Sequence, residues 1–98
     1  MTKYELLMDQ IESIKHELIS VGDMRPGNLN KQFRKPKEKL GEYYQLNYTF
    51  GGRTRTEHVR KENIAIVKAE LEEYQRAKIL FSKWLELSIQ ASKMRLKK

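Results

Sequence analysis

Residues 53–56 carry the side chains whose types and spacing point most directly to chemistry. They read Arg-Thr-Arg-Thr and follow Gly51-Gly52. Guanidinium and hydroxyl groups are frequent partners of phosphate oxygens, and a two-stranded ribbon can enter the major groove of a duplex. The main phosphate contacts expected are Arg53, Arg55, Arg60 and Lys61, with Thr54 and Thr56 assisting. Further phosphate contacts around the ribbon are expected from Lys31, Arg34, Lys35, Lys37 and Lys39.

Two other interpretations of these side chains stay open. The arginines could remain in solvent while the apolar residues of the same segment pack on a helix. An acidic surface of a protein partner would also attract the same charges, and the sequence does not separate that partner from a nucleic acid.

The net charge of the chain, +7 over 98 residues, is unevenly distributed. Residues 1–21 hold two lysines against four acidic residues, residues 22–61 hold ten basic against four acidic, and residues 62–98 hold eight against five. A basic middle segment beside an acidic helix suits contact with a polyanion over one face. Excess lysine also serves solubility, so this distribution alone does not decide the partner.

Catalytic and metal-binding side chains have little support in the sequence. The chain has no cysteine, which excludes disulfides and cysteine-based zinc sites, and neither His16 nor His58 has a second ligand at metal-binding spacing. The carboxylates within residues 70–73 are typical of a solvated helix face. Gly51-Gly52 lacks the following Lys-Ser/Thr of a phosphate loop. We therefore expect no enzyme activity, no metal and no cofactor.

The hairpin that must position the arginines is predicted over residues 42–59. Alternating runs rich in Tyr, Thr and Phe flank Gly51-Gly52, which tolerates the positive φ angles of a two-residue turn. Its cross-strand pairs are expected to be Phe50 with Arg53, Tyr48 with Arg55, Leu46 with Glu57, and Tyr44 with Val59. Tyr44, Leu46 and Val59 would anchor its base to a helix.

Two helices are predicted on either side of the hairpin. Thr2 and Glu5 form a capping box that begins a helix over residues 1–21, and Gly22 is expected to end it. Residues 22–41, with two prolines and three glycines, are expected to be a basic loop. A long helix is expected over residues 61–97, which contain neither glycine nor proline.

Apolar stripes on both helices predict how they pack. The second half of the long helix is apolar over more than one stripe, so it should contact two neighbours, which favours a homodimer. The expected core or dimer residues are Leu7, Ile11, Ile14, Leu18, Leu80, Phe81, Trp84 and Leu87.

Two segments, Met24 to Leu29 (MRPGNL) and Gly41 to Ile64 (GEYYQLNYTFGGRTRTEHVRKENI), resemble an uncharacterised family of small bacterial and phage or mobile-element proteins. Members of that family combine a short helix, Met-Arg-Pro-Gly-Ser-Leu, a cysteine-containing knuckle, a Tyr-Tyr-x-Leu hairpin and a long charged helix. The resemblance covers most of residues 20–90 and implies this layout, but no activity, since none is assigned to the family. KQFRKPKEK stands where the family has cysteines, so only the basic character of the knuckle remains. The order strand, turn, strand, helix is also similar in layout to the arm-type DNA-binding domain of tyrosine recombinases.

The sequence therefore predicts an α+β, mostly α fold in a single small domain over residues 1–98: helix, basic loop, β-hairpin and long helix, with the helices packed as a coiled-coil-like hairpin or dimer. No apolar run approaches the length of a membrane span and no leader pattern precedes the first helix, so we expect a cytoplasmic protein without membrane contact. The leading hypothesis is a non-enzymatic nucleic-acid-binding accessory or regulatory protein. The alternative is a protein-binding inhibitor or adaptor, such as a phage protein that blocks a host defence nuclease.

Overall fold

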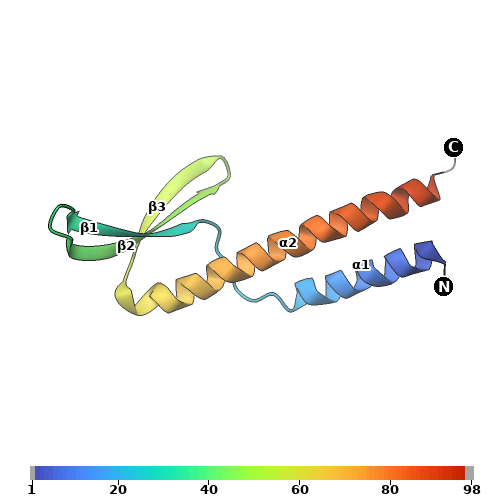
Figure 1. The fold of residues 1–98 in the computed structure, drawn as a ribbon, viewed down its shortest axis with the longest axis horizontal. Helices are drawn as coiled ribbons and strands as arrows, with labels where there is room; N and C mark the ends of the chain where they lie inside the picture. Colours follow the sequence, from blue (N-terminus) through green and yellow to red (C-terminus); the bar gives the residue numbers. More distant parts are fainter. Residues whose placement is uncertain (1, 97–98) are drawn as a thin grey trace. The chain divides into compact units, whose positions relative to one another are not determined.

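The computed structural model describes residues 2–96 and has two helices and a three-stranded antiparallel sheet (Figure 1). The α+β, mostly α fold expected from the sequence is confirmed. The elements are α1 (Lys3–Ile19), β1 (Asn28–Lys35), β2 (Leu40–Phe50), β3 (Arg53–Val59), a 3-10 turn (Lys61–Asn63) and α2 (Ile64–Arg95). Expected helical residues 1 and 97 lie outside the described part. The chain divides into two compact units, which are described separately: Met1–Gly22 with Gln75–Lys98, and Asp23–Tyr74.

The start of α1 follows from its predicted cap. The Thr2 hydroxyl oxygen accepts a hydrogen bond from the Glu5 N–H at 3.1 Å and donates to the Glu5 carboxylate at 3.3 Å. The predicted stop at Gly22 is wrong, because the helix ends at Ile19 with Ser20 as its C-cap. The Ser20 N–H and hydroxyl both donate to the Glu17 carbonyl, at 3.1 and 2.6 Å, and satisfy a carbonyl that a glycine cap would otherwise serve.

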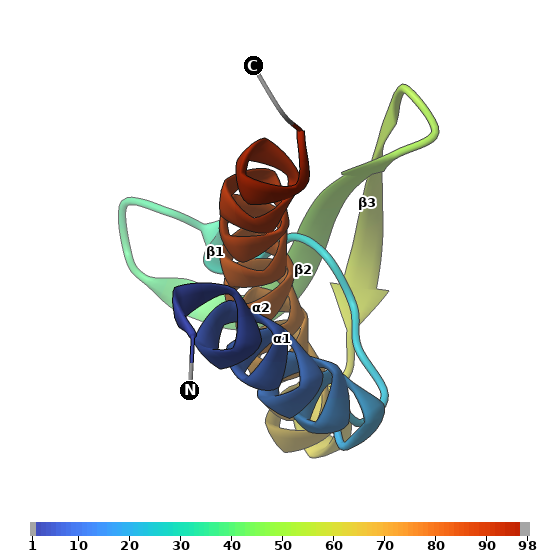
Figure 2. The ribbon, with the colours of Figure 1, turned by 90° about the vertical axis from the view of Figure 1, so that its right-hand side faces the viewer.

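In the helical unit, α1 lies antiparallel to the second half of α2 (Figures 1 and 2). Arg95 near the end of α2 donates to the Tyr4 hydroxyl at 2.9 Å, and Arg76 donates to the Ser20 hydroxyl at 2.6 Å. The buried side chains between the helices are Leu7, Ile11, Ile14, Leu80 and Ala91. Leu18, Trp84 and Leu87 are partly buried. Phe81 lies outside this core, with 58% of its surface exposed.

The β2–β3 hairpin has the predicted register. Phe50 pairs with Arg53, Tyr48 with Arg55, Leu46 with Glu57 and Tyr44 with Val59. Gly51 and Gly52 form the turn with φ angles of 62° and 78°, so both central residues need the positive φ that glycine allows.

The prediction of a basic loop over residues 22–41 is wrong, because strand β1 lies within these residues. This strand pairs antiparallel with β2, with Leu29 opposite Leu46 and Phe33 opposite Glu42. A four-residue turn, Pro36–Lys39, connects the two strands, and β2 begins at Leu40, two residues before the expected start. The apolar side chains of β1, Leu29 and Phe33, are four residues apart, so its period of two is hidden because Lys31 stands at the position between them on the same face.

The core of the sheet unit lies between one face of the sheet and the first turns of α2. Leu46 is fully buried, and it packs with Val59 and Val67. The side chains around them are Leu29, Tyr44, Tyr48, Ile64 and Leu71. The expected anchoring of the hairpin base on the long helix is therefore confirmed. No helix within residues 2–96 has an apolar stretch that would reach across a bilayer.

Candidate nucleic-acid interface

The two faces of the sheet differ in chemistry. Side chains alternate between faces along a strand, so the neighbours of the core residues point away from α2. We call the side that they form the open face. It consists of Asn28, Asn30, Gln32, Arg34, Gly41, Tyr43, Gln45, Asn47, Thr49, Thr54, Thr56 and His58. None of these described residues is buried and none carries a carboxylate, whereas the face toward α2 includes Glu42 and Glu57.

The basic residues predicted to surround the hairpin divide between the two ends of the sheet. Arg53 and Arg55 lie at the Gly51-Gly52 turn, while the others lie at the far end of β2. That second group consists of Arg34, Lys35, Lys37, Lys39, Arg60 and Lys61. Since β2 has 11 residues, its ends are roughly 33 Å apart at about 3.3 Å per residue. The basic residues expected to surround the ribbon therefore form two separate groups, one at each end of β2.

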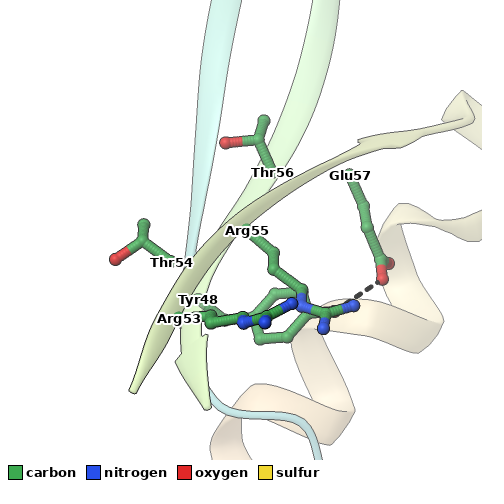
Figure 3. A pocket seen from close by; sticks show the side chains of 6 residues that line it. All are labelled: Tyr48, Arg53, Thr54, Arg55, Thr56 and Glu57. Carbon is green, nitrogen blue, oxygen red and sulfur yellow. Dashed lines mark hydrogen bonds between the residues drawn. The ribbon is translucent and has the colours of Figure 1, made fainter. Parts of the chain in front are cut away.

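At the Gly51-Gly52 end, the arginines and threonines point to opposite sides of the ribbon (Figure 3). Arg53 and Arg55 share their side with Tyr48 and Glu57, in an open hollow of about 580 Å³. The Tyr48 hydroxyl donates to the Glu57 carboxylate at 3.0 Å. This hollow thus combines two guanidinium groups with one carboxylate, so its attraction for anions is weaker than the arginines alone suggest.

Glu57 is held in its ionised form by two donors. The Arg25 guanidinium donates to it at 3.0 Å and lies over the Tyr48 ring, 5.0 Å from its centroid. The hydrogen bond from Arg25, followed by that from Tyr48, lowers the pKa of the Glu57 carboxyl below its ordinary value. Arg25 thus shares the negative charge of Glu57, and the charge of Arg55 also contributes to lowering the pKa of this carboxyl.

Thr54 and Thr56 belong to the open face, where they pair with residues of β2. The Thr54 and Thr49 hydroxyls are 3.0 Å apart, and the Thr56 hydroxyl donates to the Asn47 side-chain oxygen at 2.8 Å. Each threonine therefore already has a hydrogen-bond partner on the open face, although both also contribute to the hollow that Arg53 and Arg55 line.

The far end of the sheet carries a row of planar side chains on the open face. The Arg34 guanidinium lies over the Tyr43 ring at 5.4 Å, and the Tyr43 and His58 rings are stacked with centroids 6.1 Å apart and planes at 23°. These three residues and Lys61 contribute to a hollow of about 260 Å³, which is also lined by the acidic residue Glu42 and by two further residues of the other face, Tyr44 and Val59. Planar and cationic groups thus come together here from all three strands.

Lys31 does not belong to the open face. Its ammonium group forms a 3.0 Å ion pair with Glu42, and this hydrogen bond raises the pKa of Lys31 above its ordinary value. Both groups are about half exposed, with 47% of each side chain accessible, so the pair is screened and contributes little to stability. The charge of Lys31 is partly compensated by Glu42, and its side chain lies on the face opposite the open face.

Sequence reasoning missed Arg25 and Gly27. The Arg25 N–H donates to the Glu70 carbonyl at 3.1 Å, which ties this segment to α2. Gly27 has a φ of 120°, and a Cβ there would lie 2.4 Å from the Asn47 carbonyl oxygen. The proline-glycine pair before β1 was the available signal, because a glycine at a strand start often marks close backbone approach.

Within residues 2–96, no group of three or more His, Cys, Asp or Glu side chains is arranged to hold a metal ion. Comparisons with protein-family models, with curated proteins and with solved structures give no match for this chain. Its function is therefore argued from its own side chains.

Proposed function

We propose that this chain is a non-enzymatic nucleic-acid-binding protein, an accessory or regulatory protein of phage or mobile-element origin. The observation that carries the proposal is the open face, which has hydrogen-bonding side chains, no carboxylate, and Arg34 at its far end, near Lys61 and the basic Pro36–Lys39 turn. Amide and hydroxyl groups bind base edges and sugars, and lysine and arginine bind phosphates. A polyanionic strand on the open face would meet cations at the far end of the sheet, while Arg53 and Arg55 project from the other side of the ribbon at the Gly51-Gly52 turn.

Two groups of cations about one strand length apart favour an extended ligand over a small anion. A single phosphate reaches only one end of the sheet, whereas a nucleic acid repeats its charge along its length. Polar amides between the cations keep the path free of negative charge. The residues at the two ends are therefore expected to contribute to the same binding event.

Salt-dependent titration tests this proposal. The protein is titrated with duplex and single-stranded oligonucleotides of DNA and RNA, starting at about 50 mM salt, where phosphate contacts are strong. We expect log K to fall linearly with log salt. Removing two phosphate contacts should reduce the slope by about 1.8 for a duplex or about 1.4 for a single strand.

Two double variants and a matched control locate the surface. Lys37→Gln with Lys39→Gln removes two charges at the far end, and Arg53→Gln with Arg55→Gln removes two at the turn. Lys83→Gln with Lys93→Gln removes two exposed charges from the helical unit. Equal weakening by the control pair would show that only net charge matters. If no nucleic acid binds at about 50 mM salt, the proposal is wrong. The alternative, a protein-binding inhibitor or adaptor, then replaces it.

We also propose that the helical unit pairs with a second copy of the chain. Phe81, Leu85 and Ile89 recur every four residues on α2 and are 58%, 52% and 49% exposed. Residues with this spacing lie on one helix face, and a two-fold axis would place each stripe against its copy. Light scattering should give a dimer mass that Phe81→Glu reduces to a monomer. Ile19→Glu, at a position 80% exposed, is the control; a monomer of the unaltered chain at high concentration would refute the pairing.

A further inference from the structure

The row formed by Arg34, Tyr43 and His58 crosses the open face, with one residue from each strand. The two outer members, Arg34 and His58, are exposed, whereas Tyr43 between them is half-buried. The core does not require these three side chains, because they lie on the face away from α2, while the residues next to them in the sequence face α2. We call it the planar row.

The backbone makes room for the planar row. Gly41 has a φ of 67°, and a Cβ there would lie 3.1 Å from the Arg34 Cβ and 3.4 Å from its Cγ and Cδ. Because Gly41 has no side chain, the Arg34 side chain can lie over β2 and reach the Tyr43 ring. His58 reaches the same ring from β3, so Tyr43 orients both outer groups.

Flat π systems bind to flat groups of this kind. Arginine guanidinium planes and aromatic rings are the groups on which proteins stack unpaired bases, and such stacking depends little on base identity. The adjacent hollow of about 260 Å³ is smaller than the roughly 300–1,000 Å³ of sites for drug-sized ligands, which suits a single planar group. Lys61 at this hollow would bind a neighbouring phosphate.

We propose that the planar row stacks unpaired bases, so that the preferred ligand of this chain is single-stranded nucleic acid. The inference rests on the proposed function and names its substrate class. In a duplex the base faces are covered by neighbouring bases, so only a single strand offers them to Arg34 and His58. Asn30 and Gln45, opposite each other next along the open face, can donate to and accept from base edges.

An abasic oligonucleotide separates stacking from charge. A thymidine oligonucleotide and an abasic strand of the same length carry equal phosphate charge, so their affinity ratio reports the bases. For the unaltered protein we expect a ratio of about 5- to 150-fold per stacked base, and preference for the single strand over a duplex. Lys37→Gln should lower both affinities and leave the ratio unchanged.

Substitutions in the planar row should change the ratio of thymidine to abasic affinity, and should leave the slope of log K against log salt unchanged. Tyr43→Ala should reduce the ratio toward one, and Tyr43→Phe, which keeps the ring, should restore it. Arg34→Lys keeps the charge and removes the plane, so it should lower the ratio even if Tyr43→Ala fails to fold. Equal binding of the thymidine and abasic strands, or an unchanged ratio in Arg34→Lys, would overturn this inference while nucleic-acid binding stands. Absence of binding to every oligonucleotide would overturn the proposed function itself.

Discussion

Gly27→Ala tests how the segment before β1 is joined to the sheet. Gly27 has a φ of 120°, which L side chains rarely adopt, and its added Cβ would lie 2.4 Å from the Asn47 carbonyl oxygen and 2.8 Å from the Tyr48 Cβ. Both contacts involve atoms next to or within the backbone of β2. No rotation of a side chain relieves them, so the start of β1 must move away from β2.

The expected loss of stability in Gly27→Ala is the sum of two costs, one from the unfavourable φ and one from the weaker pairing of β1 with β2. The unfavourable φ costs about 1–3 kcal/mol, and weakening a hydrogen bond of the β1–β2 ladder costs about 1 kcal/mol more. A total of about 2–4 kcal/mol compares with about 3–8 kcal/mol for the sheet unit, Asp23–Tyr74, at about 0.05–0.15 kcal/mol per residue. The substitution should therefore remove a large fraction of the stability of the sheet.

Amide hydrogen exchange measures this loss, because it follows the β1 and β2 amides separately from the helical unit. Gly51→Ala is the matched control: its φ is 62°, but a Cβ there meets nothing within 4 Å, so only the left-handed backbone cost of about 1–2 kcal/mol applies. We expect Gly27→Ala to lose at least 1 kcal/mol more protection than Gly51→Ala. Equal losses would refute the close approach of Gly27 to β2.

Three further substitutions test other parts of the structure. Leu46→Ala removes the one described side chain that is completely buried, and should lower the free energy of unfolding of the sheet unit by about 2–5 kcal/mol in a urea titration. Glu57→Gln removes a carboxyl whose pKa is lowered by Arg25, so its contribution is present above the ordinary pKa and lost as the pH falls through the folded pKa. Hydrogen exchange of the hairpin should show a difference from the unaltered chain at neutral pH that vanishes in acid; a difference that persists in acid would contradict the ion pair. Thr2→Ala should cost α1 about 1 kcal/mol, seen as faster exchange of the Glu5 amide, because its cap is lost.

The β2–β3 hairpin was predictable because the residues that determine its turn and register are close together in the sequence. Gly51-Gly52 determines the turn, and a two-residue turn leaves only one register for the strands that it joins. The start of α1 was predictable for the same reason, since the Thr2 cap lies three residues from Glu5. Each of these elements depends on residues close together in the sequence.

Strand β1 was not predictable because its pattern is mostly polar. Only Leu29 and Phe33 are apolar, and between them Lys31 places its ammonium group against Glu42. Edge strands often carry lysine, which discourages pairing with other chains, and this weakens their hydrophobic period. The partner that defines β1 is β2, and the pairing of Leu29 with Leu46 joins residues far apart in the sequence.

The arrangement of the candidate site could be predicted only in part. Alternation along β3 places Arg53 and Arg55 on one side and the threonines on the other. It does not show that Arg25, 32 residues before Glu57 in the chain, neutralises that carboxylate. Nor does it show that the cations separate to two ends, because that division depends on β1 and its turn.

Tyr43 and Tyr44 show why the planar row calls for a functional explanation. These adjacent residues point to opposite faces of β2, and Tyr44 packs on the core around Leu46. Packing against α2 explains the ring of Tyr44. It does not explain the ring of Tyr43, because a small polar residue at that position would complete the strand equally well. Instead a ring stands there, flanked by Arg34 and His58 from the two neighbouring strands. Since three planar groups meet on the side that the core does not use, binding of another flat molecule accounts for them better than packing does.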